Sequence, residues 1–257
     1  GLPVKSCMTP LAEAMKVESV EGLPKLPGDD AEPQIHLVEI KEVDVLIIGA
    51  GPAGLAAAVE LGKLGVETLI IDDKNRTGGK LVLQTHKFFG SVEDSYAGTR
   101  GFEIAAILEE EINKLESVDI RLNTTAVGVF SDKIIGAVKG VRGSRYRQIK
   151  PKKLLIATGA REKMLSFPGN TLPGVYGAGA FQTLVNRDLV KSSEKVLIVG
   201  GGNVGLIAGY HAIQAGIEVV ALIEALPQVG GYKVHADKLK RLGVPILTGH
   251  TVVAAGG

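Results

Sequence analysis

The sequence predicts an α/β fold, because an apolar strand, a glycine-rich turn and a helix follow one another twice along the chain. The first copy begins with VDVLIIGAGPAG (43–54) and the second with KVLIVGGGNVG (195–205). In the first copy, residues 45–48 are fully apolar and mostly β-branched, which is typical of a strand buried on both faces of a parallel sheet. The two turns lie 151 positions apart, too far to be adjacent halves of one sheet, so we expect two separate domains.

The first turn has the G-x-G-x-x-G spacing of a dinucleotide site, with Gly49, Gly51 and Gly54 at the glycine positions. The first glycine permits a tight turn, the second lets a pyrophosphate approach the backbone, and the third lets the helix pack close to the strand. The following helix, 55–64, offers free N–H groups and a positive dipole end to phosphate. Asp72 lies 23 positions after Gly49, near the offset of about 20 for an acid that binds ribose hydroxyls. We therefore predict nucleotide binding; a glycine turn without a ligand is the alternative.

The second turn repeats this spacing with Gly200, Gly202 and Gly205, and Glu224 follows the next strand 24 positions after Gly200. A carboxylate at that place accepts a hydrogen bond from a ribose 2′-hydroxyl and repels a 2′-phosphate. Because no arginine pair follows Glu224, the sequence favours NAD over NADP. The alternative is a surface glutamate beside a degenerate site.

The remaining segments predict further α/β elements. The doublet Gly78-Gly79 can lie flat against a phosphate or a ring, and residues 100–115 have the spacing of an amphipathic helix. Four strand-like runs at 118–123, 126–130, 134–141 and 153–157 predict a small antiparallel meander that leads into a final strand. Residues 244–247 and 251–254 are predicted to be strands as well.

Composition narrows the class of protein. The net charge of +1 provides no field for nucleic acid or anionic membranes, and no apolar run is long enough to span a bilayer. The single cysteine, Cys7, excludes a disulfide within the chain and favours a reducing, cytoplasmic setting. No acid–base pair or nucleophile stands at a convincing spacing, so catalytic residues remain unknown from the sequence.

The order of these motifs resembles that of the two-dinucleotide-binding-domain flavoproteins of the pyridine nucleotide-disulfide oxidoreductase superfamily. The order is GAGPAG, Asp72, Gly78-Gly79, the ATG triplet at 157–159, GGGNVG and Glu224. Within that group, QTHKFFGS (84–91) and AGAFQTLVNRD (178–188) resemble the alpha subunits of sarcosine oxidase, opine oxidase, hydrogen cyanide synthase and dye-linked L-proline dehydrogenase. The resemblance covers residues 40–257. The sequence departs from thioredoxin reductase and the lipoamide-type enzymes because it has no C-x-x-C or C-x₄-C pair, which excludes dithiol–disulfide exchange within this chain.

The prolines and glycines of residues 1–40 predict a tail or linker. The resemblance implies that an FAD domain at 41–165 and an inserted NAD(P) domain at 166–257 follow it. It implies FAD contacts from the first turn, the ribose acid, the doublet, the adenine region and the ATG loop: Gly49, Gly51, Pro52, Ala53, Gly54, Asp72, Gly78, Gly79, Val127, Thr158 and Gly159. It implies NAD contacts from Gly200, Gly202, Asn203, Gly205 and Glu224.

The resemblance also implies that the chain is a fragment. Family members return to the FAD domain through a G-D motif after the NAD domain, and we expect such a segment beyond residue 257. Residues 4–19 resemble the end of a plant-type 2Fe–2S domain with Cys7 as its last ligand, although one cysteine alone cannot hold a cluster, and a stray cysteine is the alternative. No other metal site is expected.

The resulting functional prediction is an FAD-dependent oxidoreductase, the flavin- and NAD-binding alpha subunit of a heteromeric amine or imino-acid dehydrogenase or oxidase. It would act on a small molecule together with a catalytic beta subunit. The alternatives are a nucleotide-binding structural or electron-transfer subunit and a free-standing NADH oxidase. The segment His86 to Phe89 is either a loop near the flavin or partner, or two core phenylalanines with an exposed histidine. His211 and Tyr210 are expected to pack in the interior.

Overall fold

The computed structural model describes residues 9–10, 12–16, 22, 38–87, 89–140 and 145–256. Cys7 lies outside these residues, so the predicted cluster ligand has no structural description here. Contacts divide the chain into Gly1–Val38 and Glu39–Gly257, and the elements described below belong to the second unit.

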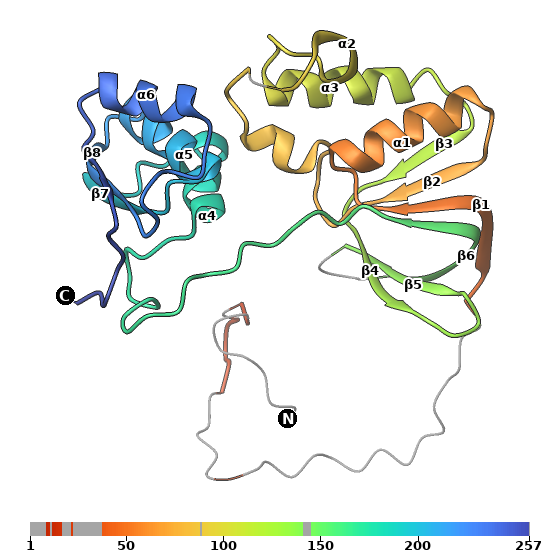
Figure 1. The fold of residues 1–257 in the computed structure, drawn as a ribbon. Coiled ribbons are helices and arrows are strands. Elements are labelled where there is room, and N and C mark those ends of the chain that lie inside the picture. The colour runs from red at the N-terminus through yellow and green to blue at the C-terminus, as the bar shows by residue number, and fades with distance from the viewer. Residues whose placement is uncertain are drawn as a thin grey trace. The chain divides into compact units, whose positions relative to one another are not determined.

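The first half of this unit is built on a six-stranded sheet with the order β3-β2-β1-β6-β5-β4 (Figure 1). The strands are β1 (Ile40–Ile48), β2 (Thr68–Ile71), β3 (Val118–Arg121), β4 (Thr124–Val129), β5 (Ile135–Lys139) and β6 (Arg145–Ile156). Strands β3, β2, β1 and β6 run parallel to one another, so the carboxyl ends of β1 and β2 meet at one edge of the sheet. This edge carries the first glycine turn and Asp72.

The predicted meander was partly wrong. The run at 118–121 pairs in parallel with β2, with Ile71 opposite Arg121, and therefore extends the parallel sheet. Only β4, β5 and the first part of β6 pair antiparallel. Strand β6 is one continuous strand shared by both parts, and its polar first residues, 145–148, concealed its beginning in the sequence.

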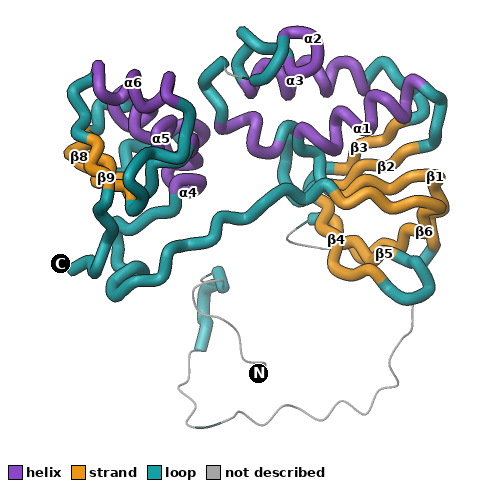
Figure 2. The backbone as a smooth tube through the Cα atoms, in the orientation of Figure 1, coloured by secondary structure: helices purple, strands orange, loops and turns teal. Residues whose placement is uncertain are grey.

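Helices cover one face of the parallel strands and the meander strands cover the other (Figures 1 and 2). Helix α1 (Pro52–Lys63) and helix α3 (Gly101–Ile112) pack with the short 3₁₀ helix η2 (Gly79–Leu83), and α2 (Val92–Ser95) precedes α3. The core on the helix side includes Ile47, Leu55, Ile70 and Ile104. The core on the other side includes Leu46, Leu69, Ile135 and Ile149.

The second half repeats the parallel arrangement on a smaller scale. Its three-stranded sheet has the order β7-β8-β9, made of β7 (Lys195–Val199), β8 (Glu218–Glu224) and β9 (Ile246–Thr248). Its helices are α4 (Ala178–Gln182), the π-helical turn η3 (Thr183–Arg187), α5 (Asn203–Gln214) and α6 (Lys233–Arg241). Leu206, Leu222 and Leu239 are fully buried in its core. Within the described part of the chain, no helix is long and apolar enough to cross a membrane.

Two details of this half differ from the sequence prediction. Residues 251–254 form no strand, since they have no pairing partner in the sheet. Helix α6 was not predicted, because it is rich in lysine and buries only a narrow stripe made of His235, Ala236 and Leu239.

Candidate functional site

The first glycine turn is held against the loop that follows β6. Gly49 has a φ of +111°, and its N–H donates to the carbonyl oxygen of Ile71 at 2.8 Å. A Cβ at Gly49 would lie 2.4 Å from the carbonyl oxygen of Ala157, and the Ala157 N–H donates to the Ile48 carbonyl at 2.8 Å. The turn therefore needs glycine for its backbone conformation and for the close approach of the ATG segment.

The third glycine is required for a reason more local than predicted. A Cβ at Gly54 would lie 1.9 Å from the carbonyl oxygen of Gly49, whereas the nearest strand side-chain atom, Cγ2 of Ile47, would be 3.3 Å away. The first turn of α1 thus folds directly onto the carbonyl of the motif's own first residue. The strand contact that the sequence predicts is present but is the looser of the two.

The doublet Gly78-Gly79 crosses the turn at the second glycine. The Gly78 N–H donates to the Ala50 carbonyl at 2.7 Å. A Cβ at Gly79, where φ is +51°, would lie 2.9 Å from the Gly51 Cα, but a Cβ at Gly51 would meet only the Gly79 Cα at 4.0 Å. Two backbones without side chains therefore face each other at the amino end of α1, where a phosphate could approach N–H groups.

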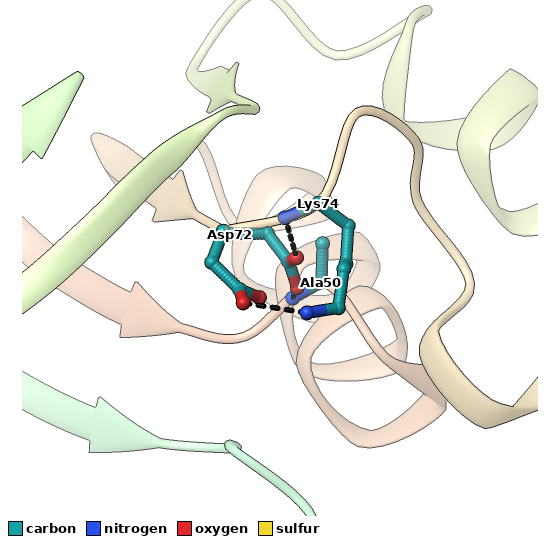
Figure 3. Close-up of polar contacts among 4 residues, drawn as sticks. Ala50, Asp72 and Lys74 are labelled. Atoms are coloured by element: carbon teal, nitrogen blue, oxygen red, sulfur yellow. Dashed lines mark hydrogen bonds and ion pairs between the residues drawn. The ribbon is translucent and has the colours of Figure 1, made fainter. Parts of the chain in front are cut away.

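Asp72, which follows the last residue of β2, contacts the first glycine turn. Its Oδ2 accepts a hydrogen bond from the Ala50 N–H at 2.7 Å, and its Oδ1 accepts one from the Lys74 N–H at 2.8 Å (Figure 3). Both bonds go from backbone donors to one carboxylate, so they fix its orientation beside the glycine turn. The structure thus places the predicted ribose acid in contact with the predicted phosphate turn.

The second turn reproduces the same contacts. Gly200 has a φ of +107° and donates to the Ile223 carbonyl at 2.8 Å, and a Cβ at Gly205 would lie 2.1 Å from the Gly200 carbonyl oxygen. Oε2 of Glu224 accepts from the Gly201 N–H at 2.7 Å, as Asp72 does from Ala50. Glu224 therefore occupies the same place in its turn as Asp72, although its side chain is one carbon longer.

Hydrogen bonds from the backbone keep Glu224 ionised. Its Oε1 accepts from the Leu226 N–H at 2.9 Å. The N–H groups of Leu226 and Gly201, in that order of effect, hold the pKa of this carboxyl below its ordinary value. A charged acceptor at this position suits a ribose diol and opposes a 2′-phosphate.

A second glycine doublet, Gly230-Gly231, was missed in the sequence. The Gly231 N–H donates to the Gly201 carbonyl at 2.9 Å, and in the first turn the Gly78 N–H, from the first glycine of its doublet, donates to the corresponding Ala50 carbonyl. Asn203 supports this loop because its Oδ1 accepts from the Tyr232 N–H at 2.7 Å. The spacing in the sequence could have indicated this doublet, because a glycine doublet ends seven positions after each acid, at Gly79 and at Gly231.

The other predicted positions differ in their distance from the first turn, and the Thr158 backbone nitrogen is near it, 3.2 Å from where a Cβ of Gly49 would be. Pro52 and Ala53 are exposed in the first turn of α1, and Thr158 and Gly159 follow β6. Val127 lies on β4 and is 57 % exposed. Within the described part of the chain, no group of three or more His, Cys, Asp or Glu side chains is placed to hold a metal ion.

Two histidines that are far apart in the sequence, His86 and His211, lie close together in the structure. The ring of His211, which is 2 % exposed on α5, lies 6.3 Å from the ring of His86, and His86 stacks on Phe89 at 4.7 Å. The amide nitrogen of Asn186 donates to the Leu83 carbonyl at 2.8 Å and contacts His211 Nδ1 at 3.1 Å. Because that amide nitrogen is a donor, His211 Nδ1 must accept and Nε2–H donates to the Thr85 hydroxyl at 3.2 Å. His211 is therefore a buried, neutral link between α5 and the segment after η2.

We expect the stability of the chain to fall with acid because of His211. Burial, then the nearby His86 and Lys238, lower the pKa of His211 to about 4. The unfolded chain therefore binds the extra proton first, and stability present above about pH 6.5 is lost as the pH falls towards 4, by at most about 3 kcal/mol. Thermal unfolding of wild type and His211→Gln from pH 7 to 4 measures this. The variant should show the shallower pH dependence, and equal slopes would contradict the assignment.

The fold and the two turns define an α/β protein with two dinucleotide-type sites, each closed by an acid at the end of its second strand. The family model for pyridine nucleotide-disulphide oxidoreductases matches residues 43–257. The chain belongs to this family, which confirms the resemblance inferred from the motifs.

Individual relatives agree with this assignment. The chain is 30 % identical to sarcosine oxidase subunit alpha of Rhizobium meliloti, over 78 % of this chain and 21 % of the relative. It is 32 % identical to hydrogen cyanide synthase subunit HcnB of Pseudomonas protegens, over 70 % of this chain and 38 % of the relative. The crystal structure of L-proline dehydrogenase from P. horikoshii matches with a TM-score of 0.59 and 29 % identity, over 78 % of this chain and 39 % of that one.

The chain thus spans about a fifth to two fifths of the lengths of these relatives. Family membership makes this an oxidoreductase sequence and implies binding of FAD and a nicotinamide nucleotide. The activity, substrate and partners of the whole protein are therefore proposals.

Proposed function

We propose that the chain is the flavin- and NAD-binding part of the alpha subunit of a heteromeric amine or imino-acid dehydrogenase or oxidase. The substrate would be a small molecule of the sarcosine, proline or opine type, and a beta subunit would carry part of the catalysis. The named relatives support this because two are subunits of larger enzymes and the structural match is a proline dehydrogenase. A cytoplasmic location belongs to the same proposal.

The observation that carries the proposal is the duplication of one site. Each turn has a glycine at positive φ, a third glycine folded onto its carbonyl, and an acid bonded to the second residue of the motif. Two such sites in one chain suit an enzyme that passes electrons between two dinucleotides.

The residues at the first turn fit FAD. The Gly51 and Gly79 backbones leave room where a side chain would otherwise stand, and the N–H groups at the start of α1 suit a pyrophosphate. Asp72 would bind the ribose hydroxyls, while Thr158-Gly159 and Val127 would lie along the rest of the cofactor. The flavin supplies hydride and one-electron chemistry, and this chain would bind it, orient it and exclude water from it.

The second turn would take NAD rather than NADP. Glu224 is held as a carboxylate by two backbone donors, and residues 225–232 contain no lysine or arginine to receive a 2′-phosphate. Gly200, Gly202, Asn203 and Gly205 would surround the pyrophosphate. Catalysis without a redox-active disulfide is part of the proposal, since the 257 residues contain one cysteine.

An absorption spectrum of the purified chain, reconstituted with FAD and titrated anaerobically with NADH or NADPH, tests the proposal. We expect flavin absorption that NADH bleaches at least about tenfold more effectively than NADPH, because a 2′-phosphate would meet the Glu224 carboxylate. Glu224→Gln removes the charge and should narrow that preference, and Glu218→Gln, at the exposed start of β8, is the matched control. An unchanged preference in Glu224→Gln would contradict the role of Glu224.

A second candidate function is a nucleotide-binding subunit whose partner performs the chemistry. The relatives that are named as subunits favour considering it. A chain that retains an adenine nucleotide but takes up no flavin would support this candidate over the first. Turnover of NADH with oxygen and no partner would instead identify a free-standing NADH oxidase.

A further inference from the structure

A cavity of about 580 Å³ lies beside β3, and none of the residues proposed for the two dinucleotide sites lines it. Its wall comes from β3, from the segment that follows it and from single positions on β5 and β6. The charged residues in the wall are Arg121, Lys139 and Arg147 against one carboxylate, Asp119. The volume falls within the range of about 300–1,000 Å³ that is usual for small-molecule sites.

The single carboxylate is already engaged by cations. Oδ2 of Asp119 lies 3.0 Å from Nε of Arg121, with which it forms a salt bridge, and 3.5 Å from Nζ of Lys41. Two positive charges in the wall, those of Lys139 and Arg147, therefore lack a carboxylate among the lining residues. Such an excess favours an anion over a neutral ligand.

Arg147 provides a second, independent observation. Its Nε is buried, and no acceptor in the described part of the chain lies within hydrogen-bonding distance. An unsatisfied buried donor on a charged group costs on the order of 1–3 kcal/mol or more, so such atoms are normally matched by a ligand or a bound water. A guanidinium matches the oxygens of phosphate or carboxylate in geometry as well as charge.

Backbone hydrogen bonds connect the residues that line the cavity to the rest of the sheet. The Gly140 N–H donates to the Asn123 carbonyl at 2.9 Å, and the Asn123 N–H donates to the Lys74 carbonyl at 2.8 Å. Arg147 stands opposite Ala137 in the register of β5 and β6. The cationic side chains thus project from strands whose spacing is set by the sheet, which is the condition for a preorganised site.

We infer that this cavity binds a small dianion, a molecule that carries a phosphate group or two carboxylates. Its two negative charges would balance the two positive charges of Lys139 and Arg147. One of its oxygens would accept a hydrogen bond from the Arg147 guanidinium. This anion site is separate from the two dinucleotide sites, and the inference does not depend on which substrate the proposed enzyme uses.

Nuclear magnetic resonance of the 257-residue chain tests the inference, with inorganic phosphate and succinate as probes and sodium acetate as the monoanionic control. The side-chain Nε–H resonance of Arg147 should shift in a saturable way with one or both dianions and not with acetate at equal ionic strength. A shift with phosphate alone assigns a phosphate site, and a shift with succinate alone assigns a dicarboxylate site. The absence of saturable shifts with both would overturn the inference.

Lys139→Gln supplies the matched variant, because its side chain is exposed and its loss leaves the Arg147 resonance observable. We expect it to raise the Kd of the bound dianion about tenfold, the effect of one charged contact. Lys153→Gln, which removes an exposed lysine on β6 outside the cavity, should leave the Kd within about twofold. If wild type and Lys139→Gln bound the dianion with equal Kd values, the proposed role of Lys139 in this cavity would be wrong.

Discussion

Replacing Gly54 by alanine will abolish flavin binding, because the new methyl group would meet backbone that has no freedom to move. The Cβ would lie 1.9 Å from the Gly49 carbonyl oxygen, which belongs to the turn itself. Either α1 separates from the turn or the turn loses its shape, at a cost on the order of 4 kcal/mol. FAD per chain after reconstitution, measured from absorbance, should fall below about a tenth of wild type.

Gly205→Ala is the matched change in the second turn. Its Cβ would lie 2.1 Å from the Gly200 carbonyl oxygen, so the clash is similar but is confined to the second turn. We expect this variant to keep its FAD and to lose bleaching by NADH. If Gly205→Ala lost FAD as Gly54→Ala does, the assignment of one cofactor to each turn would be wrong.

Gly51→Ala separates folding from binding. A Cβ there would meet only the Gly79 Cα at 4.0 Å, so the fold should tolerate it, with a melting temperature close to that of wild type. FAD affinity should nevertheless fall, since the methyl group would occupy space that the pyrophosphate needs. Unchanged affinity would place the pyrophosphate elsewhere.

Replacing Asp72 by alanine is expected to weaken FAD binding at least about a hundredfold, or about 3 kcal/mol. The carboxylate accepts two backbone hydrogen bonds, from Ala50 and Lys74, and the variant leaves both donors without it. It also removes the acceptor proposed for the ribose hydroxyls. Quenching of flavin fluorescence on binding to apoprotein measures the Kd.

Asp73→Ala is the control for that experiment. Asp73 is the neighbouring residue, and its carboxylate forms an exposed ion pair with Lys74 Nζ at 2.6 Å. Exposed pairs contribute between about 0 and 1 kcal/mol, so the Kd should change less than about fivefold. Equal losses in the two variants would show that net charge, and not the position of Asp72, controls FAD affinity.

The two glycine turns and their acids could be predicted from the sequence because they are local. Each consists of a strand, a turn and a helix within about 25 residues, and glycine spacing reports directly on backbone that must approach backbone. Strand β2, Thr68–Ile71, which leads to Asp72, consists entirely of buried residues, as is typical of a strand inside a parallel sheet. The family assignment rests on the same local motifs and is confirmed by the match over 43–257.

Pairing partners could not be predicted in the same way. The run at 118–121 carries no mark that tells a parallel strand from a meander strand, and only its position beside β2 decides. Helix α6 was missed because its many lysines hide a narrow buried stripe. The role of the doublet Gly230-Gly231 is visible in the structure, where Gly231 donates a hydrogen bond to Gly201. The spacing of the doublet indicates this role only when the two turns are compared.

The sequence by itself determined the duplicated dinucleotide motif, the order of the two glycine turns and the family, because these depend on residues close together in the chain. The tertiary structure decided what depends on residues far apart. It brought His211 to Thr85, 126 positions away, and it gathered Arg121, Lys139 and Arg147 around one cavity. Buried charge and desolvation arise only when strands and helices close over such groups, so their chemistry appears with the fold. The turn at Gly49 belongs to both levels: its glycines are readable in the sequence, and the reason for them is the Ala157 carbonyl that the sheet places 2.4 Å from where a Cβ would be.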